Sequence, residues 1–228
     1  MWHVYFRRFA LSVFAVCIVI LLSFCLVALN TQTEQSNTQR VALQFPFLID
    51  GTDLIAEYFL SYEGDYFEDQ SGDFVMDCGG LCVYNRSDTQ ITFASLNIET
   101  LDGLYTFEGT CIPPHTKVVM LEKYKSANPE SGAYFAAGKT VCTTKTNVVN
   151  ALQLEVIAVG CMKVTNISAS PLSNITLYYK RYDSQWDIYI GGVTYAISAG
   201  DLQPGESILV FPDNYAKGYS KVLYATAE

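Results

Sequence analysis

Cysteine, histidine and arginine are the side chains of this sequence that could carry out covalent chemistry together. A thiolate paired with a histidine attacks a carbonyl carbon, and an arginine can hold the oxyanion that develops. Cys142, His115 and Arg181 are the candidates for these three roles. His115 follows two prolines in PPHT, a context that favours a turn residue. The sequence therefore favours a non-catalytic protein and keeps a cysteine transpeptidase as the alternative.

The remaining cysteines suggest either disulfides or buried thiols. Cys78 and Cys82 could close a small loop around Gly79-Gly80-Leu81, and Cys111 could pair with Cys161. Since the number of cysteines after residue 30 is odd, free thiols are an equally good interpretation. No paired ligand spacing accompanies them, so neither zinc nor another cofactor is expected.

Two stretches imitate ligand sites. GAYFAAGKT at 132–140 resembles a phosphate-binding loop, but five residues separate its glycines where that motif has four. An acidic run could supply calcium ligands, yet it lacks the alternating order of a calcium loop. Its members are Glu63, Asp65, Glu68, Asp69, Asp73 and Asp77. The sequence thus favours a solvated acidic segment and no nucleotide.

Aromatic residues offer the best candidate for a binding surface. The chain has 16 Tyr, 13 Phe and 2 Trp. In the stretch 175–182, alternation predicts that Ile175, Leu177 and Tyr179 face the core. The side chains predicted to form an outward stripe are Tyr178, Lys180, Tyr182, Trp186 and Tyr189. Aromatic rings on a sheet face can stack on sugar rings or anchor a protein partner, although they are also good strand formers.

The elements that position these residues are predicted to be strands. Short β-branched or aromatic runs are separated by turn residues such as Pro113-Pro114 and Pro204-Gly205. Strands are expected near 81–85, 91–98, 104–108, 117–123, 151–158, 161–166, 174–181, 187–197, 207–211 and 221–226. The pattern is typical of antiparallel β-sandwiches. Only the spacing of apolar residues in 54–59 permits a short helix.

The sequence also contains an internal similarity. Superposing Asn85 on Asn166 aligns two blocks without gaps inside either block. The matched pairs are Ser87 and Ser168, Ile91 and Leu172, Leu96 and Leu177, Tyr105 and Tyr195, Ile112 and Leu202, and Pro114 and Pro204. The connection between the blocks is nine residues longer in the second copy. Loops tolerate such insertions, so we expect two related sandwiches, at about 78–145 and 146–228.

The amino-terminal region predicts a membrane anchor. Residues 9–29 carry no charge and follow Arg7 and Arg8. A helix of this length spans roughly 30 Å, the thickness of the hydrocarbon layer. The two arginines favour a cytoplasmic amino end, so the rest of the chain is expected outside the membrane. The range 1–30 is then an uncleaved anchor, with a removed signal as the alternative, and 31–77 is a polar spacer and acidic, aromatic lead-in.

Charge narrows the choice of partners. The formal net charge is −9 at pH 7. Such a surface repels phosphate groups, so nucleic acid is not an expected partner.

The second copy contains short strings with a family resemblance. They are VTNIS at 164–168, ITLYYK at 175–180, GGVTY at 191–195, LQPGES at 202–207 and SKVLYA at 220–225. The chain resembles the repeated extracytoplasmic modules of uncharacterised Gram-positive surface proteins, close to the FxLYD-type, immunoglobulin-like modules. The resemblance implies duplicated immunoglobulin-like antiparallel sandwiches and a location at the cell envelope, and it leaves the ligand open.

Together these patterns predict a single-pass membrane protein whose carboxy-terminal part is extracytoplasmic and all-β. Its expected role is non-catalytic binding, adhesion or assembly at the envelope, with a cell-wall glycan or a protein as partner. A sortase-like cysteine transpeptidase and a structural spacer are the alternatives.

Overall fold

The computed structural model describes residues 41–66, 68, 69, 71–143 and 145–228, of which 42–228 belong to one compact unit. The anchor predicted at 9–29 and the spacer up to residue 40 lie outside the described residues. Among the residues that are described, no helix is long and apolar enough to cross a membrane. In the described residues the regular structure consists of strands and one 3-10 turn at Val149–Ala151, which confirms the predicted all-β class.

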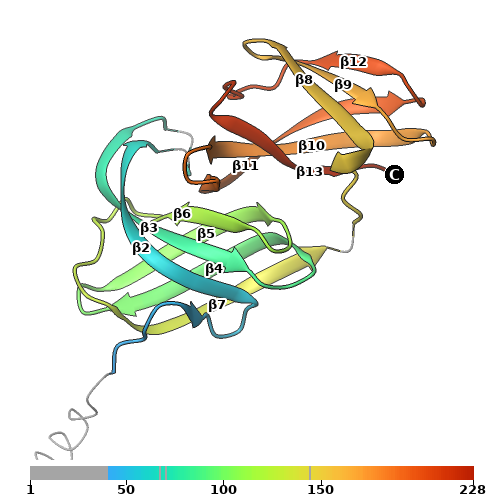
Figure 1. The fold of residues 1–228 in the computed structure, drawn as a ribbon. Helices are drawn as coiled ribbons and strands as arrows, with labels where there is room; N and C mark the ends of the chain where they lie inside the picture. Colours follow the sequence, from blue (N-terminus) through green and yellow to red (C-terminus); the bar gives the residue numbers. More distant parts are fainter. Residues whose placement is uncertain (1–40, 67, 70, 144) are drawn as a thin grey trace, which may run out of the picture. The chain divides into compact units, whose positions relative to one another are not determined.

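The first half of this unit is a sandwich of two sheet layers (Figure 1). Its strands are β1 (Phe47–Leu48), β2 (Leu54–Asp65), β3 (Phe74–Asn85), β4 (Gln90–Thr100), β5 (Leu104–Ile112), β6 (Lys117–Leu121) and β7 (Ala133–Thr143). One layer has the order β1-β2-β3-β6 and the other the order β5-β4-β7. Buried apolar side chains from both layers, among them Leu81, Leu96 and Phe107, form one core between them.

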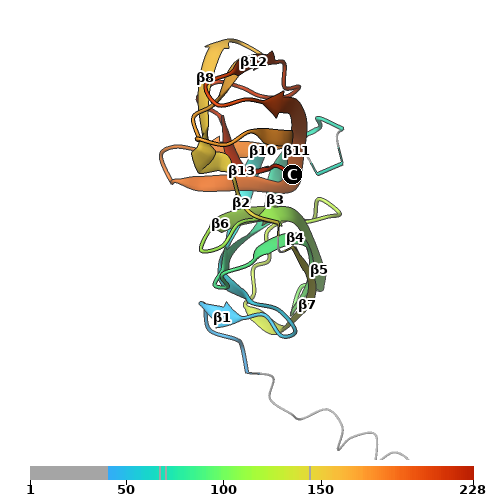
Figure 2. The ribbon, with the colours of Figure 1, turned by 90° about the vertical axis from the view of Figure 1, so that its right-hand side faces the viewer.

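The second half is a sandwich of the same kind. Its strands are β8 (Leu152–Ala158), β9 (Cys161–Asn166), β10 (Leu172–Asp183), β11 (Ile188–Leu202), β12 (Ser207–Val210) and β13 (Ser220–Thr226). The layers have the orders β8-β9-β12 and β11-β10-β13. A separate core lies between them and includes Val164, Ile175 and Leu177. Figure 2 shows both sandwiches from a second direction.

The two sandwiches share their strand order and one turn. The Asn85 side chain accepts hydrogen bonds from the backbone N–H and hydroxyl of Ser87, and it donates to the carbonyls of Thr89 and Ile112. The Asn166 side chain makes the corresponding bonds in the second sandwich. Its partners are Ser168, Ser170 and Leu202. Both asparagines are fully buried. Each one links, by hydrogen bonds, the turn that follows it to a second connection of the same sandwich.

One strand pair joins the two sandwiches into a larger sheet. The first residues of β11 lie parallel to β6, with Tyr189 opposite Val118 and Ile190 opposite Val119. The result is a seven-stranded sheet with the order β1-β2-β3-β6-β11-β10-β13. The sequence pattern predicted antiparallel pairing throughout, so this parallel contact is an addition to that prediction.

The helix that the sequence permits at 54–59 is wrong, because this segment lies within β2. The pairing register between β2 and β3 shifts between Ala56 and Tyr58. A bulge adds a residue on one strand and reverses the alternation of side chains beyond it. Leu54 and Ala56 therefore face the core, whereas the following apolar residues fall at positions that imitate a helical spacing.

Every strand predicted from residue 81 onward overlaps a strand of the structure, but β1, β2 and β7 were not predicted. β1 and β2 lie in the range assigned to the spacer and lead-in, and they pair with each other and with β3. β7 contains most of the stretch that imitates a phosphate-binding loop, and it pairs antiparallel with β4.

Candidate functional site

A wide bulge in β11 forms the site at which chemically capable side chains gather. Tyr179 of β10 lies opposite Tyr195, while Arg181 lies opposite Ile190. Four residues of β11, Gly191–Thr194, therefore face the single residue Lys180 across the strand pair. We call residues 191–194 the GGVT bulge. Gly191 has φ +85°, a conformation that glycine adopts without steric cost.

Lys180 binds the carbonyl side of this bulge. Its ammonium Nζ donates to the carbonyls of Gly191 at 2.9 Å, Gly192 at 2.7 Å and Val193 at 3.0 Å. An ammonium has three donors, so all of them have partners. The side chain is fully buried, and burial lowers its pKa to about 8, although the nearby Glu68 carboxylate opposes this shift. The predicted outward orientation of Lys180 is therefore wrong.

Glu68 binds the amide side of the same bulge. The residue lies in the connection between β2 and β3, in the first sandwich. Its carboxylate accepts hydrogen bonds from the backbone N–H groups of Gly192 and Val193, the latter at 2.9 Å, and from that of Leu121 at 3.4 Å. Burial raises the pKa of this carboxyl, while the amide donors and Lys180 act in the opposite direction.

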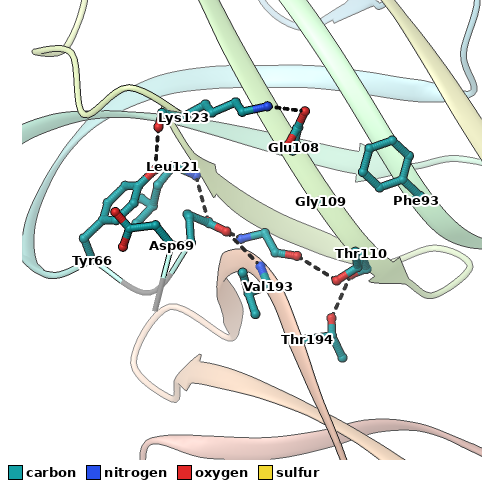
Figure 3. Close-up of a pocket in the computed structure, with 12 residues that line it drawn as sticks. Tyr66, Asp69, Phe93, Glu108, Gly109, Thr110, Leu121, Lys123, Val193 and Thr194 are labelled. Atoms are coloured by element: carbon teal, nitrogen blue, oxygen red, sulfur yellow. Dashed lines mark hydrogen bonds and ion pairs between the residues drawn. The ribbon is translucent and has the colours of Figure 1, made fainter. Parts of the chain in front are cut away.

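Two threonines bind the GGVT bulge to the first sandwich through hydrogen bonds. The hydroxyl of Thr110, on β5, donates to the carbonyl of Gly192 at 3.0 Å, and the hydroxyl of Thr194 donates to the carbonyl of Thr110 at 2.8 Å. Figure 3 shows Thr110 and Thr194 reaching toward each other across this contact. A Cβ atom on Gly192 would lie only 1.8 Å from the carbonyl oxygen of Glu108. Only glycine fits at this position.

These residues form a clamp, by which we mean Glu68, Lys180, Thr110 and Thr194 around the GGVT bulge. A carboxylate binds the N–H ends of the same short backbone segment whose carbonyl ends an ammonium binds. The charges thus align with the peptide dipoles between them, an arrangement that stabilises both ions in a buried setting. Because Glu68 and Lys180 belong to different sandwiches, the clamp holds the two together.

An open pocket of about 360 Å³ lies beside the clamp. Its walls include Tyr66, Phe93 and the ion pair between Lys123 and Glu108, whose charged atoms are 2.8 Å apart. In Figure 3, Phe93 lies on the side of the pocket away from Tyr66. The lining offers carboxylates and one paired cation.

The residues of the predicted aromatic stripe do not share one exposed surface. Tyr182 packs against Tyr189 with ring centroids 5.3 Å apart, and the ammonium of Lys221 lies 4.4 Å above the Tyr182 ring. Tyr178 packs instead against Tyr224 of β13. Trp186 is 74% exposed and lies between β10 and β11. Tyr178, Tyr182 and Tyr189 are thus partly buried packing residues, and Trp186 is the exposed member of the set.

The structure has free thiols where the sequence left both disulfides and free thiols open. All five described cysteines, Cys78, Cys82, Cys111, Cys142 and Cys161, are free thiols. Cys78 and Cys82 lie four residues apart on the same strand, which separates their Cα atoms by about 13 Å, far beyond the reach of a disulfide. Burial raises the pKa of the Cys78 thiol to about 11 and that of Cys111 to about 12.

The three candidate catalytic residues have separate surroundings. His115, in the connection between β5 and β6, has its ring Nε2 2.9 Å from a carboxylate oxygen of Asp88. Arg181 lies 3.7 Å from Asp65. Cys142 is exposed on β7. Strand β4 lies between β7 and the β5 strand that leads to His115.

The acidic run is divided among structural contacts. Asp69 and Asp73 bind the ammonium of Lys125 at 2.8 and 2.7 Å, and Glu68 belongs to the clamp. In the part of the chain that the structure describes, no three histidine, cysteine or acidic side chains gather as metal ligands would.

Sequence reasoning did not identify Glu68, Thr110 or Thr194 as partners. One signal was present, because the alignment of the two halves of the sequence places the nine-residue length difference between Leu177 and Tyr195. The GGVT bulge lies in that interval, and its two adjacent glycines indicate a close backbone approach.

Comparison with known proteins adds no relative to this description: no model of a protein family, no curated protein and no solved structure matches the chain.

Proposed function

We propose that this chain is a non-catalytic binding or assembly protein of the cell envelope, anchored in the membrane by residues 9–29. Its extracytoplasmic part consists of two copies of one immunoglobulin-like sandwich, and it presents their surface to a cell-wall glycan or a protein partner.

The clamp is the observation that carries this proposal. Lys180 and Glu68 are charged groups that would be candidates for catalysis, and both bind backbone groups of the GGVT bulge. Their hydrogen bonds join the two sandwiches. This structural role suits a protein that presents a rigid surface to a binding partner. The fully buried Glu122 likewise accepts hydrogen bonds from backbone N–H groups, those of Thr106, Tyr124 and Ser126. The buried thiols of Cys78, Cys82 and Cys111 lie in packed apolar clusters.

The equivalent asparagines support the duplication. The partners of Asn85 and Asn166 occupy aligned positions, including Thr89 and Ser170. Their backbone bonds also correspond, because the N–H of Asn85 donates to Thr116 and that of Asn166 donates to Glu206. Such agreement in buried hydrogen bonds is expected when one module has been copied.

Labelling of Cys142 in intact cells tests the location. This thiol is exposed on β7, so a membrane-impermeant maleimide should modify the full chain in intact cells. The Cys142→Ser variant is the control, and its labelling should fall sharply. Labelling that requires cell lysis would contradict the extracytoplasmic location.

A retention assay tests the binding role. Purified chain from residue 41 onward is mixed with cell-wall glycan strands and, separately, with detergent-solubilised envelope proteins. Saturable retention on one of them is the expected result. Retention on neither would contradict the binding role and favour a structural spacer.

A further inference from the structure

The outer surface of strand β6, in the first sandwich, is buried by a cluster to which both sandwiches contribute. Val119 and Leu121 point away from the first core and belong to a buried cluster that contains Ile188 and, at its margin, Ile190. Their exposed fractions are only 3% and 1%. The edge of β6 is also paired, since Val118 and Val119 lie beside Tyr189 and Ile190.

The equivalent strand of the second sandwich is β12, and it is uncovered. The alignment that matches Ile112 with Leu202 places Leu209 at the position of Val119 and Phe211 at that of Leu121. Neither side chain is buried as Val119 and Leu121 are, since Leu209 is 51% and Phe211 is 65% exposed. Within the described residues, β12 pairs on one side with β9 and forms the edge of its sheet.

An exposed apolar sheet edge favours pairing with another strand. Unpaired N–H and carbonyl groups form a template, and proteins usually protect such edges with charged side chains, proline or a covering loop. Ile208 and Leu209 give β12 an apolar character instead. Beside it lies an open pocket of about 460 Å³ whose walls include Phe211, Tyr195 and Arg181.

We propose that the β12 edge binds a strand from another protein's β-sandwich, carried on a long hairpin and added in parallel. The model for this contact is the pairing of β11 with β6 in the chain itself. The partner strand would place two apolar side chains beside Leu209 and Phe211, as Ile188 and Ile190 lie in one cluster with Val119 and Leu121. This inference deepens the proposed assembly role and rests on it, because the edge must be accessible to a partner outside the membrane.

The described residues of a second copy of this chain include no free hairpin of this kind. The long hairpin of the second sandwich already pairs with β6 of its own chain. The first sandwich has its shorter hairpin at the corresponding place, where β4 and β5 are separated only by residues 101–103. The partner is therefore a different polypeptide whose hairpin is as long as that between β10 and β11.

A peptide titration tests the site. The probe is a synthetic peptide of residues 183–195, added to ¹⁵N-labelled chain 41–228 and followed by amide chemical shifts. We expect the shifts to cluster at residues 207–211. A spin label on the amino end of the peptide should broaden the amide of Ser207 more than that of Phe211, because the strands are parallel.

Two variants serve as matched controls. Leu209→Lys should weaken binding about tenfold or more, since it places a charge at the centre of the contact. Val141→Lys introduces the same charge on β7, where the wild-type residue is similarly exposed, and should leave binding unchanged. A peptide carrying Ile190→Asp should bind weakly to every form of the protein.

Several outcomes would overturn the proposal. These are the absence of shifts at millimolar peptide, shifts centred on 117–121, equal effects of the two lysine variants, or broadening that requires only more protein and indicates a second copy. The titration is independent of the labelling of Cys142 in cells. A failed titration with successful labelling therefore removes the docking site and leaves the envelope location intact.

Discussion

A fully buried lysine is the most unusual residue of this protein. Lys180 has the alternation of a solvent-facing position on β10, and the sequence alone predicted that orientation. The prediction failed because the face of β10 opposite to its own core is covered by the first sandwich. Local periodicity reports which residues share a face, but it does not report that a second domain covers the other face.

Replacement of Lys180 should destabilise the protein strongly. Lys180→Met keeps a long side chain but leaves three carbonyls without donors and Glu68 without its counter-charge. A buried polar group left without its hydrogen-bond partner costs about 1–3 kcal/mol, so losing the donor to three carbonyls should lower the unfolding free energy by about 3–5 kcal/mol. Urea unfolding at pH 7 measures this loss. Lys221→Met is the control, because Lys221 lies over the exposed side of the Tyr182 ring and should lose less than about 1 kcal/mol.

The difference in unfolding free energy between wild type and Lys180→Met should depend on pH. The folded pKa of Lys180 is about 8, below its ordinary value of 10.5, so the unfolded chain binds the extra proton between these values. Raising the pH across this window removes that preference and stabilises the folded state. The unfolding free energy of wild type should therefore rise relative to Lys180→Met by up to about 3 kcal/mol between pH 8 and pH 10.5. A constant difference between the two proteins would contradict the shift.

Thiol reactivity should follow burial. Burial raises the pKa values of Cys78 and Cys111, so an alkylating reagent at pH 7.5 should modify Cys142 first and those two only after unfolding. Mass spectrometry of timed samples identifies each site. A Cys142 rate that remains high below pH 7, and that falls on His115→Ala, would instead support the transpeptidase.

At the scale of elements, the sequence could predict those strands in which buried and exposed side chains alternate regularly. β10 was predicted correctly because Ile175, Leu177 and Tyr179 share one buried face. β2 was not, because a bulge breaks its alternation, and β7 was not, because it is rich in alanine and contains Gly138. A Cβ atom on Gly138 would lie 2.5 Å from the Leu96 side chain, so close packing selects a residue with low strand propensity.

The GGVT bulge is the element on which the clamp depends, and Gly192→Ala tests it. The added methyl group would lie 1.8 Å from the Glu108 carbonyl oxygen, so the bulge must move away from β5. Hydrogen exchange at Tyr189 and Ile190 should then accelerate about a hundredfold or more, as expected when a local opening loses roughly 3 kcal/mol. Amides of β4 should accelerate less than these two, because they lose only the stability that the clamp adds to the first sandwich.

Gly200→Ala is the matched control for this element. Gly200 lies on the same strand and also has a positive φ of +67°, but no atom lies near the position of its Cβ. The substitution introduces backbone strain without a clash, so exchange at Tyr189 and Ile190 should stay within a few-fold of wild type. An equal acceleration in both variants would show that strain, rather than the close contact with Glu108, explains the effect.

At the scale of the molecule, the sequence indicated two modules and the structure adds how they are joined. The alignment depends on positions that both sandwiches use in the same way, such as the buried asparagine of the turn. The joint depends on an insertion present in only one copy, and an insertion has no counterpart with which it can be compared. Internal similarity could thus predict the modules and mark the insertion, but it could not predict the contact that the insertion makes.

A joint made of buried hydrogen bonds should make the two cores unfold together. Leu177 lies in the second core and has no exposed surface, so Leu177→Ala should cost about 2–5 kcal/mol. If the clamp couples the sandwiches, hydrogen exchange monitored by mass spectrometry should accelerate in β4 of the first sandwich as well as in β10. The reciprocal variant Leu96→Ala should act on β10 in the same way. In a Gly192→Ala background each substitution should affect only its own sandwich, because the bulge no longer transmits the loss. Independent behaviour of the two cores in the wild-type background would mean that the clamp positions the sandwiches without coupling their stabilities.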